Sequence, residues 1–244
     1  MRGGVMTLVA GFLPSTAGLH FSNSFAQVPL ETVEVPVLRV QVRIGDAAHG
    51  LCGGMVYTVM DYFAHGQVPP STTTPPQEGP LYDYLVRRLF DSWDIPRGIA
   101  RYLYLMSPQL PDYGQVGGPL GLLSHSRASV MIRDEWPQIR DDLDNNRLAP
   151  LGLIKCKSDD PVLLGQNHQV LAYGYDLQGT DLTLRIYDPN APDDDSATIS
   201  LSLAGVDRSC QLACTTAPAL YCLFRSHYEP VGPPPDGTPR APTP

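Results

Sequence analysis

The spacing of apolar residues changes near the middle of this 244-residue chain. In the first part, apolar side chains recur with the period of an α-helix, and the predicted helices cover residues 53–65, 78–94, 99–106 and 136–145. In the second part, short apolar and β-branched runs predict strands at residues 151–156, 169–177, 182–187, 198–203 and 221–228. Helices followed by antiparallel strands are typical of the α+β class. We therefore expect a helical layer packed on an antiparallel sheet.

Composition divides the sequence into three parts. Residues 1–35 are polar and rich in turn-forming residues, which predicts an N-terminal arm lying on the domain. Residues 36–228 are the predicted α+β domain, with a helical part at 50–146 and a sheet part at 150–228. The last part, residues 229–244, is rich in proline and glycine, which predicts a disordered tail.

Charge and hydropathy exclude several kinds of partner. The formal net charge is −8 at pH 7, which argues against nucleic acid and against an anionic membrane surface. No stretch approaches the roughly 18 apolar residues that a membrane span needs. Residues 5–13 resemble a short signal-peptide core, but a glycine interrupts them and only Arg2 precedes them. The sequence thus favours a cytoplasmic location over a secreted one, and it leaves the oligomeric state open.

The chain has five cysteines, and an odd number leaves at least one thiol unpaired. Cys210 and Cys214 are four positions apart, but no second His or Cys pair completes a zinc set, so we expect no metal site. No glycine-rich phosphate loop follows a strand, and we expect no cofactor. Whether Cys156, Cys210, Cys214 and Cys222 form disulfides depends on whether the protein is exported.

Cys52 differs from the other cysteines in its sequence context. It lies in Gly50-Leu51-Cys52-Gly53-Gly54, directly before the first predicted helix. The unpaired N–H groups and the positive dipole end of a helix N-terminus favour a thiolate. Flanking glycines such as Gly53 let a substrate backbone approach closely. The structural alternative is a small buried hydrophobic side chain, because free cysteine is among the most buried residue types.

His168 and Asp188 are the candidate partners of Cys52. His168 opens one predicted strand, and Asp188 ends the next one. In an antiparallel hairpin, the start of one strand lies beside the end of the other. Asp188 would then orient the imidazole, with Asn190 as the alternative because an amide also fixes the tautomer. Asp188-Pro189-Asn190 also suits a simple turn, and the two roles are compatible.

In the order Cys, His, Asp, these motifs resemble the papain-like cysteine peptidase superfamily, and most closely the bacterial peptidases similar to the double-glycine leader (bacteriocin-processing) peptidases. The resemblance covers about residues 40–228 and rests on Cys52 before the first long helix, His168 in Asn167-His168-Gln169-Val170-Leu171, and Asp188 in Tyr187-Asp188-Pro189-Asn190. It implies a papain-like fold and a thiol hydrolase that cleaves a peptide or amide bond in a peptide or protein substrate. Cys52 would be the nucleophile, His168 the base and Asp188 the orienting acid.

One position departs from this family's pattern. Papain-like enzymes carry a Gln six residues before the Cys as an oxyanion donor, and this chain has Asp46 there. An ionised carboxylate opposes an oxyanion, and the loss of one donor costs roughly 10²–10³ in rate. Three outcomes stay open: Asp46 points away or is protonated, another donor such as Gln41 or His49 serves, or the activity is weak or lost. Two alternatives therefore stay open: a transglutaminase-like acyl-transferring enzyme with the same triad, and a catalytically silent binding module.

Overall fold

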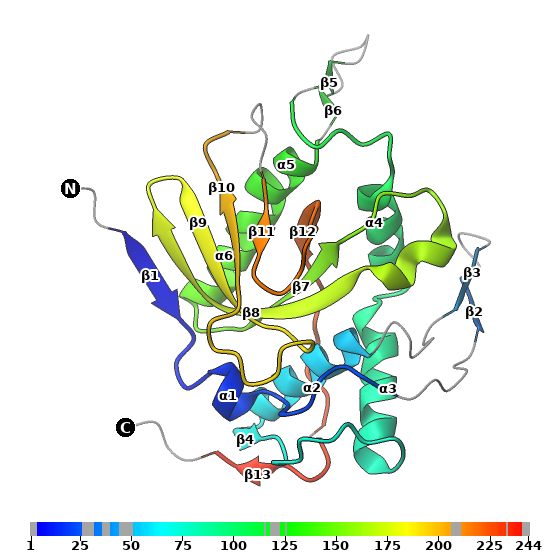
Figure 1. The fold of residues 1–244 in the computed structure, drawn as a ribbon, viewed down its shortest axis with the longest axis vertical. Helices are drawn as coiled ribbons and strands as arrows, with labels where there is room; N and C mark the ends of the chain where they lie inside the picture. The colour runs from blue at the N-terminus through cyan, green and yellow to red at the C-terminus, as the bar shows by residue number, and fades with distance from the viewer. Residues whose placement is uncertain are drawn as a thin grey trace.

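The computed structural model describes residues 4–25, 32–35, 40–43, 51–114, 116–117, 123–124, 126–205, 211–232 and 234–240. It combines helices with a curled antiparallel sheet, which confirms the predicted α+β class (Figure 1). Among the described residues, no helix has both the length and the apolar character needed to cross a bilayer.

Within the described residues, seven antiparallel strands form the main sheet in the order β11-β10-β9-β8-β7-β12, with β1 paired to the second half of β8. The strands are β1 (Val5–Leu8), β7 (Ala149–Ile154), β8 (His168–Gln178), β9 (Asp181–Tyr187), β10 (Thr198–Ser202), β11 (Ala213–Cys214) and β12 (Cys222–Arg225). Gly179, in the turn between β8 and β9, has a φ of +64°. Because glycine adopts this left-handed conformation readily, the predicted hairpin forms at this point.

Three strand pairs lie outside the main sheet. They are β2 (Thr32–Val35) with β3 (Val40–Arg43), β4 (Gln67–Val68) with β13 (Thr238–Pro239), and β5 (Val116–Gly117) with β6 (Leu123–Ser124). The pair of β4 with β13 joins the end of the chain to the segment that follows the first long helix.

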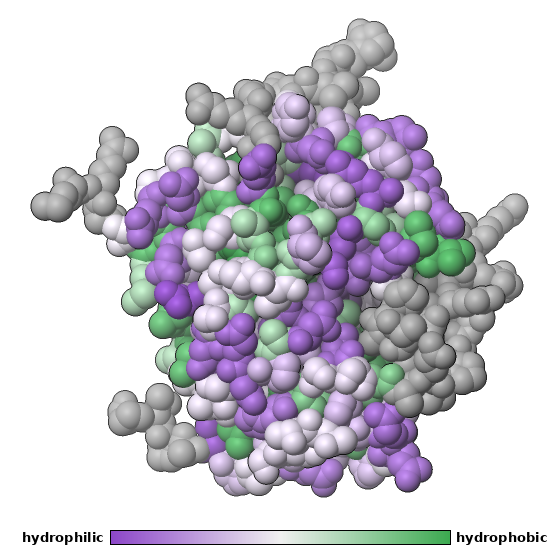
Figure 2. Space-filling model, in the orientation of Figure 1, coloured by the Kyte–Doolittle hydropathy of each residue, from purple (hydrophilic) through white to green (hydrophobic). Residues whose placement is uncertain are grey.

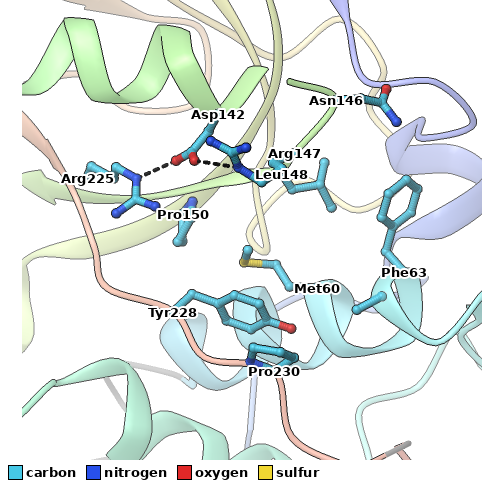
Figure 3. Close-up of a pocket in the computed structure, with 11 residues that line it drawn as sticks. Met60, Phe63, Asp142, Asn146, Arg147, Leu148, Pro150, Arg225, Tyr228 and Pro230 are labelled. Carbon is cyan, nitrogen blue, oxygen red and sulfur yellow. Dashed lines mark hydrogen bonds and ion pairs between the residues drawn. The ribbon is translucent and has the colours of Figure 1, made fainter. Parts of the chain in front are cut away.

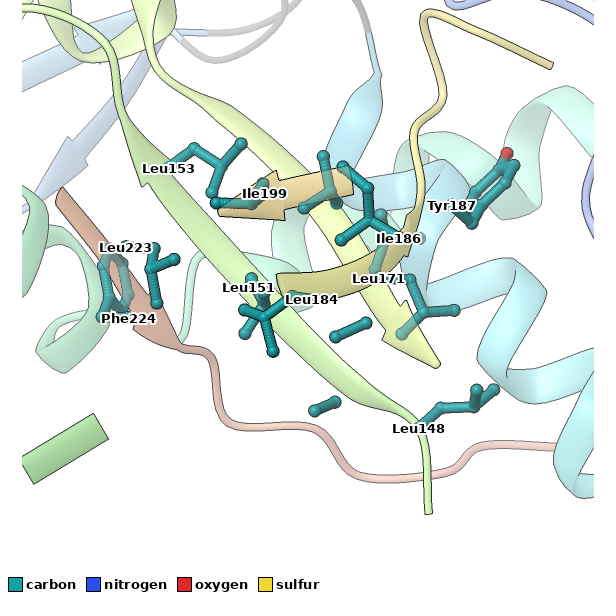
Figure 4. Close-up of a cluster of buried hydrophobic side chains, with 14 of the residues drawn as sticks. Leu148, Leu151, Leu153, Leu171, Leu184, Ile186, Tyr187, Ile199, Leu223 and Phe224 are labelled. Atoms are coloured by element: carbon teal, nitrogen blue, oxygen red, sulfur yellow. The ribbon is translucent and has the colours of Figure 1, made fainter. Parts of the chain in front are cut away.

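The central strands of the main sheet are buried on both faces. All six residues of β7 and the first eight of β8 are buried, so both strands carry continuous apolar runs. Core side chains from neighbouring strands, among them Leu151, Leu184 and Phe224, form one cluster beside the helices (Figure 4). On the face in Figure 2, apolar residues gather over the sheet in the upper half, and the lower half is mostly hydrophilic or neutral.

The helical segments are α1 (Pro14–Ala17), α2 (Cys52–Ala64), α3 (Pro80–Ser92), α4 (Arg97–Met106), α5 (Arg127–Ser129), the π-helical segment η2 (Val130–Glu135), α6 (Trp136–Asp144) and the 3₁₀ segment η3 (Pro161–Gln166). Helix α2 is buried over nearly its whole length and packs on both β8 and α3. A Cβ atom on Gly54 would lie 2.1 Å from the carbonyl oxygen of Leu85 in α3. The glycine therefore allows these two helices to approach backbone to backbone.

The N-terminal arm contributes a strand to the sheet. Residues Val5 to Leu8 pair with β8 from Leu177 back to Gly174. Farther along the arm, Leu19 and Phe21 are buried in the hydrophobic core. The arm is thus part of the domain's core as well as a segment on its surface.

The C-terminal segment differs from the predicted disordered tail. The carbonyl oxygens of Glu229, Gly232 and Pro235 accept hydrogen bonds from Arg88 at 2.9 Å, from the Tyr84 hydroxyl at 2.9 Å and from the Tyr62 hydroxyl at 2.6 Å. A proline-rich segment cannot satisfy its carbonyl groups internally, and side chains of α2 and α3 do so here. Residues 229–232 and 234–240 therefore lie against the domain rather than apart from it.

Candidate active site

Three secondary-structure elements place the candidate site. Cys52 is the first residue of α2, His168 is the first residue of β8, and Asp188 directly follows β9. The register of the hairpin places Leu171 opposite Tyr187. His168 and Asp188 therefore lie at the same end of the sheet, where α2 begins.

His168 and Asp188 form a buried pair. His168 Nε2 lies 2.7 Å from Asp188 Oδ1, and the two side chains are only 5% and 1% exposed. Asp188 also accepts hydrogen bonds from the backbone N–H of Asn190 at 2.8 Å and from the Thr216 hydroxyl. Burial raises the pKa of Asp188, but the hydrogen bond and charge of His168, with these two donors, bring it below its ordinary value. The carboxylate is consequently ionised at neutral pH.

The sulfur of Cys52 contacts the same imidazole. The His168 ring and the backbone N–H groups of Gln169 and Gly53 lie close enough to the sulfur to stabilise its thiolate form and lower its pKa. Because Nε2 bonds to Asp188, the ring nitrogen left for the sulfur is Nδ1. His168 thus lies between the thiol and the carboxylate.

Burial and electrostatic contacts act in opposite directions on the pKa values of Cys52 and His168. Burial raises the pKa of Cys52, but the charge and hydrogen bond of His168 lower it below its ordinary value. Burial lowers the pKa of His168, but the Cys52 thiolate and Asp188 raise it to about 10. These directions favour a thiolate–imidazolium pair at neutral pH, which is the reactive form of a cysteine nucleophile.

Asn190, the alternative orienting residue, lies farther from the imidazole than Asp188. Its Nδ2 is 3.3 Å from His168 Nε2, against 2.7 Å for the carboxylate oxygen. The backbone N–H of Asn190 bonds to Asp188 instead. Asp188 is therefore the direct partner of His168, and Asn190 supports it.

Sequence reasoning missed Asn23, which lies in the N-terminal arm. Its Oδ1 accepts a hydrogen bond from the backbone N–H of Leu51 at 2.6 Å, directly before Cys52. Its Nδ2 donates to Asn190 Oδ1 at 3.2 Å, and its backbone N–H donates to the Pro189 carbonyl at 2.9 Å. One side chain therefore joins the segment that carries the nucleophile to the segment that carries the orienting acid. No local motif marks it, because its partners are distant in sequence.

Gly53 has a packing role that the sequence did not predict. A Cβ atom there would lie 2.1 Å from Ser92 Oγ and 2.7 Å from Gln169 Nε2. Gln169 Nε2 in turn donates to Ser92 Oγ at 3.1 Å. Gly53 therefore faces the protein interior, where α3 and β8 meet α2, rather than a substrate as we had expected. Sequence reasoning also missed Thr216, which follows β11. Its hydroxyl donates to the Asp188 carboxylate, and the two residues are 28 positions apart in the sequence.

Several predicted residues lie outside the described residues or outside the site. Asp46 and His49 are outside the described residues, as are Cys210 and the side chain of Gln41. Among the described cysteines, Cys52, Cys156 and Cys214 are free thiols. In the part of the chain that the structure describes, no three His, Cys, Asp or Glu side chains cluster as they would around a metal ion.

Comparison of this chain with protein-family models, with curated proteins and with solved structures finds no match in any of the three.

Proposed function

We propose that the protein is a papain-like thiol hydrolase that cleaves a peptide or amide bond. One observation carries the proposal: the His168 ring contacts the Cys52 sulfur on one side and the Asp188 carboxylate on the other. The position of Cys52 at the start of α2, packed on an antiparallel sheet, supports the papain-like form of the fold. A nucleophile, a base and an orienting acid in this relation are the parts that acyl transfer to cysteine requires.

The proposed reaction begins with attack of the Cys52 thiolate on the carbonyl carbon, which forms a tetrahedral oxyanion. The oxyanion collapses, and the C–N bond breaks as the His168 imidazolium gives its Nδ1 proton to the departing amine. A water molecule then attacks the acyl-enzyme while neutral His168 accepts a proton from it. Collapse of this second oxyanion releases the carboxylic acid and restores the thiolate. Asp188 holds the ring in place throughout and stabilises its charged form.

The backbone N–H of Cys52 is the proposed oxyanion donor. It lies in the first turn of α2, where N–H groups have no acceptor within the helix. A second donor would normally complete such a site, and Asp46 stands where the family carries Gln. The rate of the proposed reaction therefore depends on whether Asp46 is ionised near the oxyanion.

The second candidate is a catalytically silent binding module, and the low exposure of the site favours it. Cys52 is 9% exposed and His168 is 5% exposed. A thiolate that no substrate can reach would serve only to stabilise the fold. Acyl transfer to an amine remains a variant of the first candidate, because it uses the same acyl-enzyme and differs only in the second nucleophile.

The test is alkylation with iodoacetamide at pH 6 and pH 8, with mass mapping of each cysteine. We expect the rate of Cys52 to fall less between pH 8 and pH 6 than that of an ordinary thiol, because its pKa is lowered. Cys156 is the internal control: burial raises its pKa, so its rate should fall by about tenfold per pH unit. A Cys52 that reacts no faster than Cys156 at pH 6 would favour the silent module.

Turnover of a peptide library by the wild type and by Cys52→Ala completes the test. Removal of the nucleophile should lower turnover by about 10⁶-fold, whereas Cys156→Ala should leave it unchanged. Added amine separates hydrolysis from acyl transfer, since only a transferase yields the amide product. Equal turnover by wild type and Cys52→Ala would end the proposal.

A further inference from the structure

A cavity of about 520 Å³ lies at the end of α2 away from Cys52 (Figure 3). Met60, Phe63 and Ala64 of α2 form one side of it, and Tyr228 and Pro230 of the C-terminal segment form another. The remaining walls come from the end of α6, the loop that follows it, the start of β7 and the end of β12. The volume is in the range of about 300–1,000 Å³ that small-molecule sites occupy.

The apolar side of this cavity is held in place by its neighbours. The Phe63 ring contacts the Phe12 ring at 5.5 Å between centroids, and the Arg240 guanidinium lies 4.1 Å from its centre. The Tyr228 hydroxyl donates to the buried Asp61 carboxylate at 2.8 Å, which fixes its ring as a wall. The cavity is therefore formed without a ligand, and a ligand would need to order little of the chain on binding.

The polar side of the cavity carries two guanidinium groups and one carboxylate. Asp142 is 4% exposed, and its two oxygens accept hydrogen bonds from Nε of Arg147 at 3.0 Å and from Nε of Arg225. A terminal nitrogen of Arg147 bonds to Asp141 at 2.7 Å. Among the described residues, Arg225 makes side-chain hydrogen bonds through its Nε alone. Its terminal nitrogens therefore remain as paired donors for an anionic group.

We propose that this cavity binds a molecule with an apolar body and a single carboxylate. The apolar body would lie against Met60, Phe63 and Leu148, and the carboxylate would accept hydrogen bonds from the terminal nitrogens of Arg225. Arg147 is already bonded to Asp141 and Asp142, so the terminal nitrogens of Arg225 are the charge-assisted donors that would select a negative ligand, even though the whole chain has a net charge of −8. This proposal stands apart from the chemistry of Cys52 and does not depend on it.

Two sources present the required chemistry: a free aliphatic or aromatic acid, and the C-terminal residue of a peptide. Both carry one carboxylate on an apolar group, and their affinities separate them. We use octanoate as the free acid and acetyl-Gly-Gly-Leu-Phe with a free C-terminus as the peptide. Octanamide and the peptide's C-terminal amide are the matched neutral controls.

The experiment is titration of the full chain labelled with ¹³C at the methionine methyl groups. Met60 lines the cavity, whereas Met55, Met106 and Met131 are buried elsewhere in the core. We expect a saturable shift of the Met60 signal with octanoate or the peptide acid and little change at the other three. The neutral controls should bind at least about tenfold more weakly, because they lack the charge-assisted hydrogen bonds.

Two variants test the two sides of the cavity. Ala64→Trp fills the cavity from an exposed position on α2 and should abolish the Met60 shift, while Ala100→Trp, on an exposed position of α4, is its matched control and should not. Arg225→Lys keeps the charge but removes the paired terminal donors, so it should weaken octanoate binding by about tenfold. A melting curve for each variant shows that it is folded.

Each outcome decides the proposal. A saturable Met60 shift that Ala64→Trp removes and Arg225→Lys weakens supports it, and the tighter of the two probes identifies the source. No saturable shift with either acid, or an unchanged shift in Ala64→Trp, overturns it. Equal binding of octanoate and octanamide overturns the carboxylate specificity.

Discussion

Two buried carboxylates lie near opposite ends of α2, and different side chains surround them. Asp188, near the helix start, faces an imidazole and a thiol, and its pKa is lowered although burial raises it. Asp61, in the last turns of the helix, is fully buried, and burial raises its pKa although Arg88, Tyr228 and Tyr84 work against this. Burial is similar in the two places, so the partners decide what each acid can do.

The Asp61 cluster is built for stability. Arg88 Nε lies 2.7 Å from Asp61 Oδ2, and both side chains are almost inaccessible. The Tyr84 and Tyr228 hydroxyls and the backbone N–H of Val231 also donate to this carboxylate. Every partner is a fixed donor that keeps its proton at neutral pH. At Asp188, by contrast, the partner is a histidine that can exchange a proton with a thiol, which is the property that chemistry requires.

Of the three substitutions predicted here, Asp188→Asn should have the largest effect, and it acts on the reactivity of Cys52 and His168. An amide cannot stabilise the imidazolium, so the pKa of His168 falls and the thiolate of Cys52 loses its counter-charge. We expect turnover to fall by roughly 10⁴-fold, and alkylation of Cys52 at pH 6 to slow by up to about tenfold for each unit by which its pKa rises.

The matched control for Asp188→Asn is Asp176→Asn, an acid on β8 that is partly exposed and pairs with Arg185. It should leave both the turnover and the alkylation rate unchanged. Asp188→Asn that alkylates at the wild-type rate would show that Asp188 does not act on the thiol through His168.

The substitution Asp61→Asn should affect stability and leave the reactivity of Cys52 unchanged. It leaves Arg88 without its buried charged partner, and breaking a buried ion pair costs about 3–5 kcal/mol in the free energy of unfolding. Urea unfolding measures this loss, and alkylation at pH 6 measures the thiol.

Asp91→Asn is the control for the Asp61 substitution, because Asp91 pairs with the same arginine but its side chain is 43% exposed. Because water screens the exposed carboxylate of Asp91, the loss of this pair should cost less than the loss of Asp61, about 0–1 kcal/mol. Should Asp61→Asn instead slow alkylation as much as Asp188→Asn does, the two clusters would not be separate in function.

The sequence predicts the elements of this fold better than their distant contacts. Apolar spacing predicted 53–65 as a helix, and α2 covers Cys52–Ala64. The two predicted strands at 169–177 and 182–187 form the hairpin that places His168 and Asp188 at one end of the sheet. These features depend on neighbouring residues, so local spacing is enough to find them.

Features that depend on distant partners were missed for a physical reason. The short strand β1 becomes ordered only because β8 offers it an edge. The proline-rich segment after residue 228 becomes ordered because Tyr62, Tyr84 and Arg88, in two helices far back in the chain, donate to its carbonyl groups. Composition alone predicts disorder there, since it contains no information about these donors.

Asn23 also acts through partners that are distant in sequence. Its substitution should have a smaller effect than Asp188→Asn or Asp61→Asn. Asn23→Ala removes hydrogen bonds to Leu51 and Asn190, and each such bond contributes about 0.5–1.5 kcal/mol. We expect about a tenfold fall in kcat with KM nearly unchanged, because Asn23 positions the nucleophile and the orienting segment without touching the substrate.

Asn23→Asp keeps the acceptor for Leu51 but loses the donor to Asn190, so it should recover part of kcat. Ser24→Ala, on the neighbouring exposed residue, should change neither constant. A rise in KM with constant kcat in Asn23→Ala would show that the arm acts on substrate binding and not on the geometry of the triad.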